Sequence, residues 1–238
     1  MDTKIVRLKR SLLFGFISLL LCGVGDWLLG YEPKGGESLL FGMSNTSITA
    51  VPSWFYILSL CFGILSGFGC YFFAPAILEV LKSKGISESS KMYKTMKFGL
   101  ASAPMMFVSF HAACCIVLMF LQASLKYGIG AAYADEAFVV PVVASLGPFL
   151  IWCWICDIPV TVAYMYFVLK GRLELPKATF VFCPLGLSII AKVIAAVMTA
   201  LGSDLAFLTA CGESWGYAFM CLEFYFVVND LGKKKVIA

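Results

Sequence analysis

Six long apolar runs dominate the sequence and restrict its fold more than any other feature. They cover roughly residues 11–30, 54–81, 98–125, 138–169, 178–201 and 205–229. Each run reaches or exceeds the roughly 20 residues that a helix needs to cross the hydrocarbon of a bilayer. Only 13% of the 238 residues are charged, whereas soluble domains carry about 25%. We therefore expect an all-α membrane protein in which six transmembrane helices form one bundle, as a single domain over residues 1–238.

Basic residues predict the orientation of this bundle. All of the 18 lysines and arginines except Lys34, Lys126 and Lys192 lie in the two tails or in the second and fourth connections between the runs. With six spans, these four regions share one side of the membrane. The positive-inside rule then predicts that both termini are cytoplasmic and that the protein resides in the cell membrane. The bilayer is the expected partner, and no soluble basic face indicates nucleic-acid binding.

Ionisable side chains inside the runs are the first candidates for function. A charge placed in lipid costs about 2.5–3.5 kcal/mol on insertion scales, so such residues commonly face the interior of a bundle. Six residues qualify: Asp26, His111, Asp157, Lys192, Glu213 and Glu223. Counted from the ends of the runs, Asp26, Glu213 and the nearby Asp204 fall toward the outer side.

Transport of a small or amphipathic molecule is one hypothesis for these residues. Asp26, Asp157, Lys192, Glu213 and Glu223 would form a polar substrate or ion path, in which Lys192 pairs with Asp157 or Glu223. Cys22-x-x-x-Asp26 in the first run is echoed by Cys153-x-x-x-Asp157 in the fourth. Such an echo is what two halves of inverted topology, a common transporter plan, would give.

An intramembrane enzyme acting on a lipid-like substrate is the alternative. Asp26 and Glu213 would act as the acid–base pair with His111 assisting, because imidazole titrates near neutral pH. His111 shares a helical stripe with Cys115, Leu118 and Gln122, which predicts that this stripe faces the bundle. The outer loop 31–53 could cap the pocket. A third hypothesis is a structural subunit of a membrane complex, and neither the oligomeric state nor a cofactor can be read from the sequence.

Cysteine and histidine spacing gives little support for a metal. One histidine cannot form a multi-histidine zinc site, and although carboxylates with Cys114 or Cys115 could complete one, their spacing matches no known signature. We therefore predict no metal. All ten cysteines lie inside the runs, and Cys153-x-x-Cys156, although spaced like a redox pair, is interpreted as packing.

Two local resemblances can be drawn from the first run. The stretch GDWLLGYEP at residues 25–33 resembles a stretch found in uncharacterised bacterial multi-pass membrane proteins, a resemblance that implies no activity. The Gly25-Asp26 pair with a following leucine is also similar to the lysoplasmalogenase-type membrane hydrolases. That resemblance implies a lipid hydrolase, although those enzymes have more spans than the six expected here.

Overall fold

The computed structural model describes residues 3–31, 33, 35, 36, 38, 39, 44–127 and 136–237, and these are predominantly helical. The long helices are α1 (Thr3–Gly30), α2 (Trp54–Ser83), α3 (Lys91–Lys126), α4 (Glu136–Leu169), α5 (Pro184–Ala200) and α6 (Gly212–Ile237). Short 3-10 helices are η2 (Thr46–Ala50), η4 (Lys177–Val181) and η5 (Asp204–Thr209). Strands β1 (Ser38–Leu39) and β2 (Ser44–Asn45) pair antiparallel, with Ser38 opposite Asn45. This hairpin was not predicted from the sequence.

Among the described residues, four helices are long and apolar enough to cross a membrane. These are α1, α2, α3 and residues Ala144–Leu169 of α4. Helix α5 has 17 residues, which corresponds to about 26 Å at 1.5 Å per residue and is slightly short of the hydrocarbon thickness of about 30 Å. The first four predicted spans are therefore confirmed as apolar helices of spanning length, whereas membrane crossing by α5 and α6 stays a prediction.

The fifth and sixth predicted runs are not the continuous helices that the sequence analysis expected. Run 178–201 is divided between η4 and α5, because Pro184 begins α5 and Cys183 before it is extended, with φ −141° and ψ 164°. Run 205–229 is divided between η5 and α6. Gly212 opens α6 directly against α5, where a Cβ atom would overlap Ser188 Cα and Leu187 O. The prediction of one continuous helix was therefore wrong for both runs. The break between η5 and α6 places the N-terminus of α6 inside the protein.

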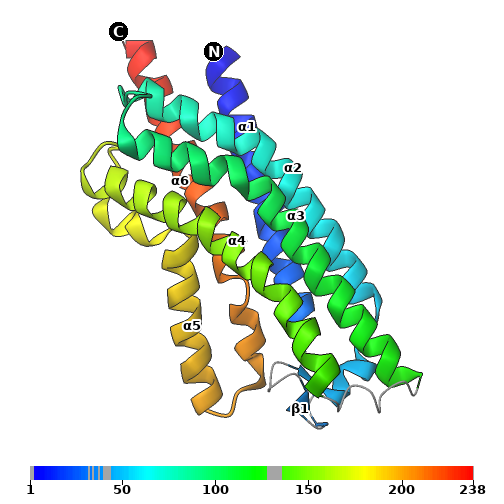
Figure 1. Cartoon of the computed structure of the whole chain (residues 1–238). Coiled ribbons are helices and arrows are strands. Elements are labelled where there is room, and N and C mark those ends of the chain that lie inside the picture. The colour runs from blue at the N-terminus through cyan, green and yellow to red at the C-terminus, as the bar shows by residue number, and fades with distance from the viewer. Residues whose placement is uncertain are drawn as a thin grey trace.

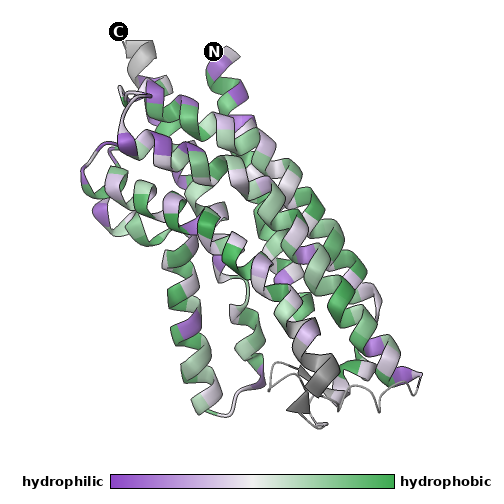
Figure 2. Cartoon of the chain, in the orientation of Figure 1, coloured by the Kyte–Doolittle hydropathy of each residue, from purple (hydrophilic) through white to green (hydrophobic). Residues whose placement is uncertain are grey.

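The helices pack in an order that differs from the order along the chain. Helix α1 packs against both α2 and α6, α3 packs against α2 and α4, and α5 packs mainly on α6 (Figure 1). The start of α1 and the end of α6 adjoin, since Gly232 lies beside Ile5. Hydrophilic residues gather at the end of the bundle that holds both termini (Figure 2). Two termini at one end agree with an even number of passes; the side of the membrane on which they lie stays a prediction.

Apolar side chains fill the bundle and also cover its outside. Large residues such as Leu12, Phe73 and Phe224 are fully buried between helices. On the outer faces Ile151, Trp154 and many other large apolar residues are exposed. An outer surface of this kind suits contact with lipid and would be costly in water. Polar residues inside the bundle are therefore the informative exceptions.

Candidate functional site

Asp26 turns into the bundle from the last turns of α1. Its side chain is only 13% exposed, and Oδ1 lies 3.4 Å from Nε2 of His111 on α3. Oδ2 accepts a hydrogen bond of 2.6 Å from Ser214 Oγ on α6. Cys22, one turn earlier on the same face of α1, places Sγ 3.1 Å from the same His111 nitrogen. Asp26 is thus part of an interhelical cluster and does not cap the end of α1.

His111 is buried, and its other ring nitrogen is also occupied. Nδ1 lies 3.2 Å from Ser59 Oγ on α2. Gly63 permits this close approach of α2 and α3, because a Cβ atom at that position would overlap Cβ and Cγ of His111. Cys115 and Gln122 are buried on the same side of α3. The prediction that this stripe faces the bundle interior is confirmed.

A small cavity borders the cluster. It has a volume of about 120 Å³ and lies between α1, α3, α4 and α6. Nine described residues line it: Asp26, Met106, Phe107, Phe110, His111, Cys153, Ala210, Glu213 and Ser214. The three residues predicted to be catalytic in the enzyme hypothesis, Asp26, His111 and Glu213, therefore meet on one cavity. None of the nine is lysine or arginine, so the charged groups that reach it are acidic.

A second carboxyl cluster lies on the α4 side of this cavity. Asp157 is completely buried, and its Oδ1 accepts a hydrogen bond of 2.9 Å from Tyr217 Oη. Oδ2 of Asp157 has no hydrogen-bond partner among the described residues. The Glu213 carboxyl group lies close enough to interact electrostatically with both Asp157 and Asp26. The two Cys-x-x-x-Asp motifs, one from α1 and one from α4, thus border the same polar region.

Two residues of the predicted polar path lie elsewhere. Lys192 is exposed on α5 and forms no ion pair with either carboxylate in the described part of the chain, so its predicted pairing with Asp157 or Glu223 was wrong. The reason is that α5 packs against α6 through small residues such as Ser188 and Ala191, so that the neighbouring Lys192 side chain points away from α6. Glu223 is half-buried near Tyr164, about 15 Å along α6 from Glu213 at 1.5 Å per residue.

The described residues 44–53, between α1 and α2, lie at the end of the bundle where α2 begins and α3 ends. Gln122 donates hydrogen bonds to the carbonyl oxygens of Ile48 and Val51 and accepts one from Ser53. No described residue of loop 31–53 lines the cavity, and its predicted role as a cap therefore finds no support in the described residues. Asp204 is exposed on η5 and does not line the cavity either.

The contact of Cys22 with Asp26 and His111 was not predicted from the sequence. Among the described residues, Cys22, Asp26 and His111 form a group whose ligand atoms all lie within 4.8 Å of one another. Cys114 and Cys115, the thiols that the sequence analysis considered as ligands, do not belong to this group. The available signal was the spacing of four between Cys22 and Asp26, which places both side chains on one helical face. All ten cysteines are free, including Cys153 and Cys156, which are buried on α4.

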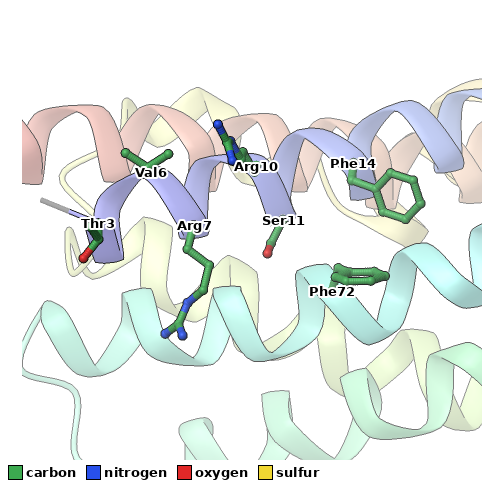
Figure 3. Close-up of a pocket in the computed structure, with 7 residues that line it drawn as sticks. All are labelled: Thr3, Val6, Arg7, Arg10, Ser11, Phe14 and Phe72. Atoms are coloured by element: carbon green, nitrogen blue, oxygen red, sulfur yellow. The ribbon is translucent and has the colours of Figure 1, made fainter. Parts of the chain in front are cut away.

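A wide surface groove is separate from this polar region. It has a volume of about 700 Å³ and lies between the start of α1 and the end of α2. Its lining is Thr3, Val6, Arg7, Arg10, Ser11, Phe14 and Phe72, with Arg7 extended toward α2 (Figure 3). Phe14 and Phe72 meet edge to face at 5.2 Å. The groove faces outward and gathers no acid–base or metal-ligating residues, so the buried cavity is the candidate site.

The chain belongs to DUF6796, a family of unknown function, and the match spans residues 1–230. This match covers far more of the chain than the local resemblance at residues 25–33. It does not test whether that short stretch is shared with other proteins. A bacterial origin also stays a prediction. Comparison with curated proteins and with solved structures gives no match.

Proposed function

We propose that this protein is a six-span membrane protein that binds a small cation in the buried acidic cavity and moves it across the membrane. The observation that carries the proposal is that carboxyl groups from α1 and α6 line one cavity while a third, from α4, lies close to one of them. Asp26 and Glu213 line the cavity, and Asp157 lies close to Glu213. A cation supplies the countercharge that these groups otherwise lack.

The size of the cavity favours a small ion over a lipid. A volume of about 120 Å³ corresponds to about four water molecules at 30 Å³ each. Drug-sized ligands usually occupy about 300–1,000 Å³. Glu213 stands in the first turn of α6, where the helix dipole stabilises a negative charge. The cavity therefore combines small volume with negative potential.

The break between η5 and α6 lies at the cavity. Ala210, just after η5, and Glu213, just after the start of α6, both line it. Transporters commonly bind substrates and ions where membrane helices are discontinuous, because the break frees backbone groups and creates a hinge between halves. A cation that leaves the cavity toward the end of the bundle with the termini would next meet the carboxylate of Glu223, further along α6.

An intramembrane enzyme is the second candidate, because Asp26, His111 and Glu213 line the same cavity. Such a geometry would permit acid–base catalysis through one bridging water. A lipid-like substrate would require the helices to part, since the cavity volume is far below that of a lipid. Hydrolysis of a lysolipid that disappears in Asp26→Asn, without cation uptake in the unmodified protein, would favour the enzyme.

The topology of the proposal can be tested with reporter fusions. We expect a reporter that is active only outside the cytoplasm to be active when fused after Ser203, between α5 and α6. The same reporter will be inactive after Gly171 or Lys233, because the basic connections and the C-terminal tail are proposed to be cytoplasmic. Inactivity after all three residues would contradict membrane crossing by α5 and α6.

Glu213→Gln will slow cation uptake at least tenfold. Two unit charges 4 Å apart interact with about 4 kcal/mol at an effective dielectric constant of 20, so one lost carboxylate is expected to weaken binding strongly. Full-length protein in liposomes is measured with a trapped cation-sensitive dye and a panel of monovalent and divalent salts.

Asp230→Asn is the matched control for this experiment. It removes one carboxylate from an exposed position on the same helix, so uptake should stay at the unmodified rate. If no cation enters faster than into protein-free liposomes, or if Asp230→Asn slows uptake as much as Glu213→Gln, the proposed transport is wrong.

A further inference from the structure

Cys22, Asp26 and His111 bring three different ligand types together inside the helix bundle. Cys22 and Asp26 project from one face of α1, and His111 reaches them from α3. The three ligand atoms, Sγ, Oδ1 and Nε2, lie within 4.8 Å of one another. Burial of such groups together is costly unless each is paired or holds an ion. Each of the three side chains has a polar partner here, and together they direct three possible metal ligands toward one another.

The spacing of the ligand atoms matches a tetrahedral zinc site. Zn–S and Zn–N bonds of about 2.3 and 2.0–2.1 Å place sulfur and nitrogen about 3.6 Å apart, and nitrogen and a carboxylate oxygen about 3.3 Å apart. The separations here are 3.1 Å from Cys22 Sγ to His111 Nε2 and 3.4 Å from His111 Nε2 to Asp26 Oδ1. The nitrogen–oxygen separation agrees with a zinc site, and the sulfur–nitrogen separation would have to lengthen by about 0.5 Å to admit the ion.

Neighbouring hydroxyl groups orient the ligands in the way that metal sites require. Ser59 Oγ lies 3.2 Å from the far nitrogen of His111, which leaves Nε2 directed at Cys22 and Asp26. Ser214 donates to Oδ2 of Asp26 at 2.6 Å and so leaves Oδ1 toward His111. Outer hydrogen bonds of this kind fix ring orientation and ligand basicity at metal centres.

The donor set selects the class of ion. Na⁺, Mg²⁺ and Ca²⁺ prefer oxygen ligands, whereas a thiolate with an imidazole and a carboxylate suits Zn²⁺ and similar divalent transition metals. Three protein ligands also leave a fourth position open. Asp26 and His111 line the cavity of about 120 Å³ that Glu213 also lines, so the fourth position would face this cavity.

We propose that Cys22, Asp26 and His111 bind one divalent transition-metal ion of the zinc class. Binding releases the proton of the Cys22 thiol as the sulfur–metal bond forms, and the ring of His111 coordinates as neutral imidazole. The inference rests on the proposed cation function and names the ion that the cavity receives. The alternative to be separated from it is a cluster held only by hydrogen bonds around His111 Nε2.

The test uses full-length protein in detergent, stripped with a chelator and titrated with Zn²⁺ and with Co²⁺. We expect one equivalent of metal per chain and a thiolate-to-cobalt charge-transfer absorption. Cys22→Ser will abolish that absorption, and Cys22→Ser and Asp26→Asn will each weaken Zn²⁺ binding at least tenfold. Cys61→Ser, an exposed cysteine on α2, is the matched control and will bind like the unmodified protein.

Several outcomes would overturn the inference, and they differ from those that contradict transport. Bound Co²⁺ without thiolate absorption in the unmodified protein excludes Cys22 as a ligand, whether or not a variant folds. Absence of stoichiometric Zn²⁺ binding, or equal loss in Cys61→Ser, excludes the site. Uptake of another cation with no Zn²⁺ binding rejects the metal inference alone, whereas Zn²⁺ binding without uptake supports this site and rejects transport.

Discussion

Gly63→Val will disrupt the candidate site and destabilise the bundle. Even a Cβ atom at this position would overlap Cβ and Cγ of His111, so α2 and α3 must separate to accommodate valine. Overpacking of a close helix contact costs about 1–3 kcal/mol and occasionally more. At roughly 2–4 °C per kcal/mol, the melting temperature in detergent should fall by about 5 °C or more. Binding at His111 should weaken as well, because the ring moves away from Cys22 and Asp26.

Gly147→Ala is the matched control for this prediction. Gly147 also lies within a long helix, but a Cβ atom there would meet nothing within 4 Å. Alanine favours helix over glycine by about 1 kcal/mol, so the melting temperature should stay equal or rise slightly. If Gly63→Val melts like the unmodified protein, the close packing of α2 on His111 is not what holds the site together.

Asp157→Asn will slow cation uptake at least tenfold while raising the melting temperature. The amide keeps an oxygen that can accept the Tyr217 hydroxyl, and it removes a buried carboxyl group that interacts with Glu213. Removal of the unfavourable interaction between two neighbouring buried carboxyl groups should stabilise the fold by on the order of 1 kcal/mol. A gain in stability with a loss of activity is the trade-off expected when charges are kept for function.

Tyr217→Phe separates the effect of charge from the effect of hydrogen bonding. It removes the Tyr217 hydroxyl that donates to Asp157 Oδ1 and leaves this oxygen without that donor. Stability should fall by about 1–3 kcal/mol, the cost of a buried polar group left unsatisfied. Cation uptake by Asp157→Asn at the unmodified rate would contradict a functional role for this carboxylate. A lower melting temperature of Asp157→Asn would contradict the predicted gain in stability.

The helical architecture could be predicted largely from the apolar runs. The first four runs became α1 to α4, because a stretch of 20 or more apolar residues has few alternatives to a long helix. The breaks in the last two runs were harder to predict. Pro184 was visible in the sequence as a helix-starting residue, but the contact of Gly212 with α5 depends on how two helices approach each other.

Most residues of the candidate site could be predicted from the sequence, but the contact of Cys22 with His111 and the outward direction of Lys192 could not. Asp26, His111 and Glu213 were identified because ionisable groups are rare in spans, and the structure gathers them on one cavity. Lys192 was identified for the same reason, yet it points outward from α5. Counting depth along a run does not tell which way a side chain faces, since that depends on the rotation of each helix against its neighbours.

The sequence by itself determined that this chain forms long apolar helices and that a few charged groups lie within them. Hydropathy and chain length suffice for both conclusions, because the bilayer sets the length and the cost of charge. Only the tertiary structure decided that Cys22 and Asp26 meet His111, and that Glu213 and Asp157 lie next to them. Those contacts join residues up to 192 positions apart, as between Cys22 and Ser214, and they depend on the packing of α1 against α2 and α6.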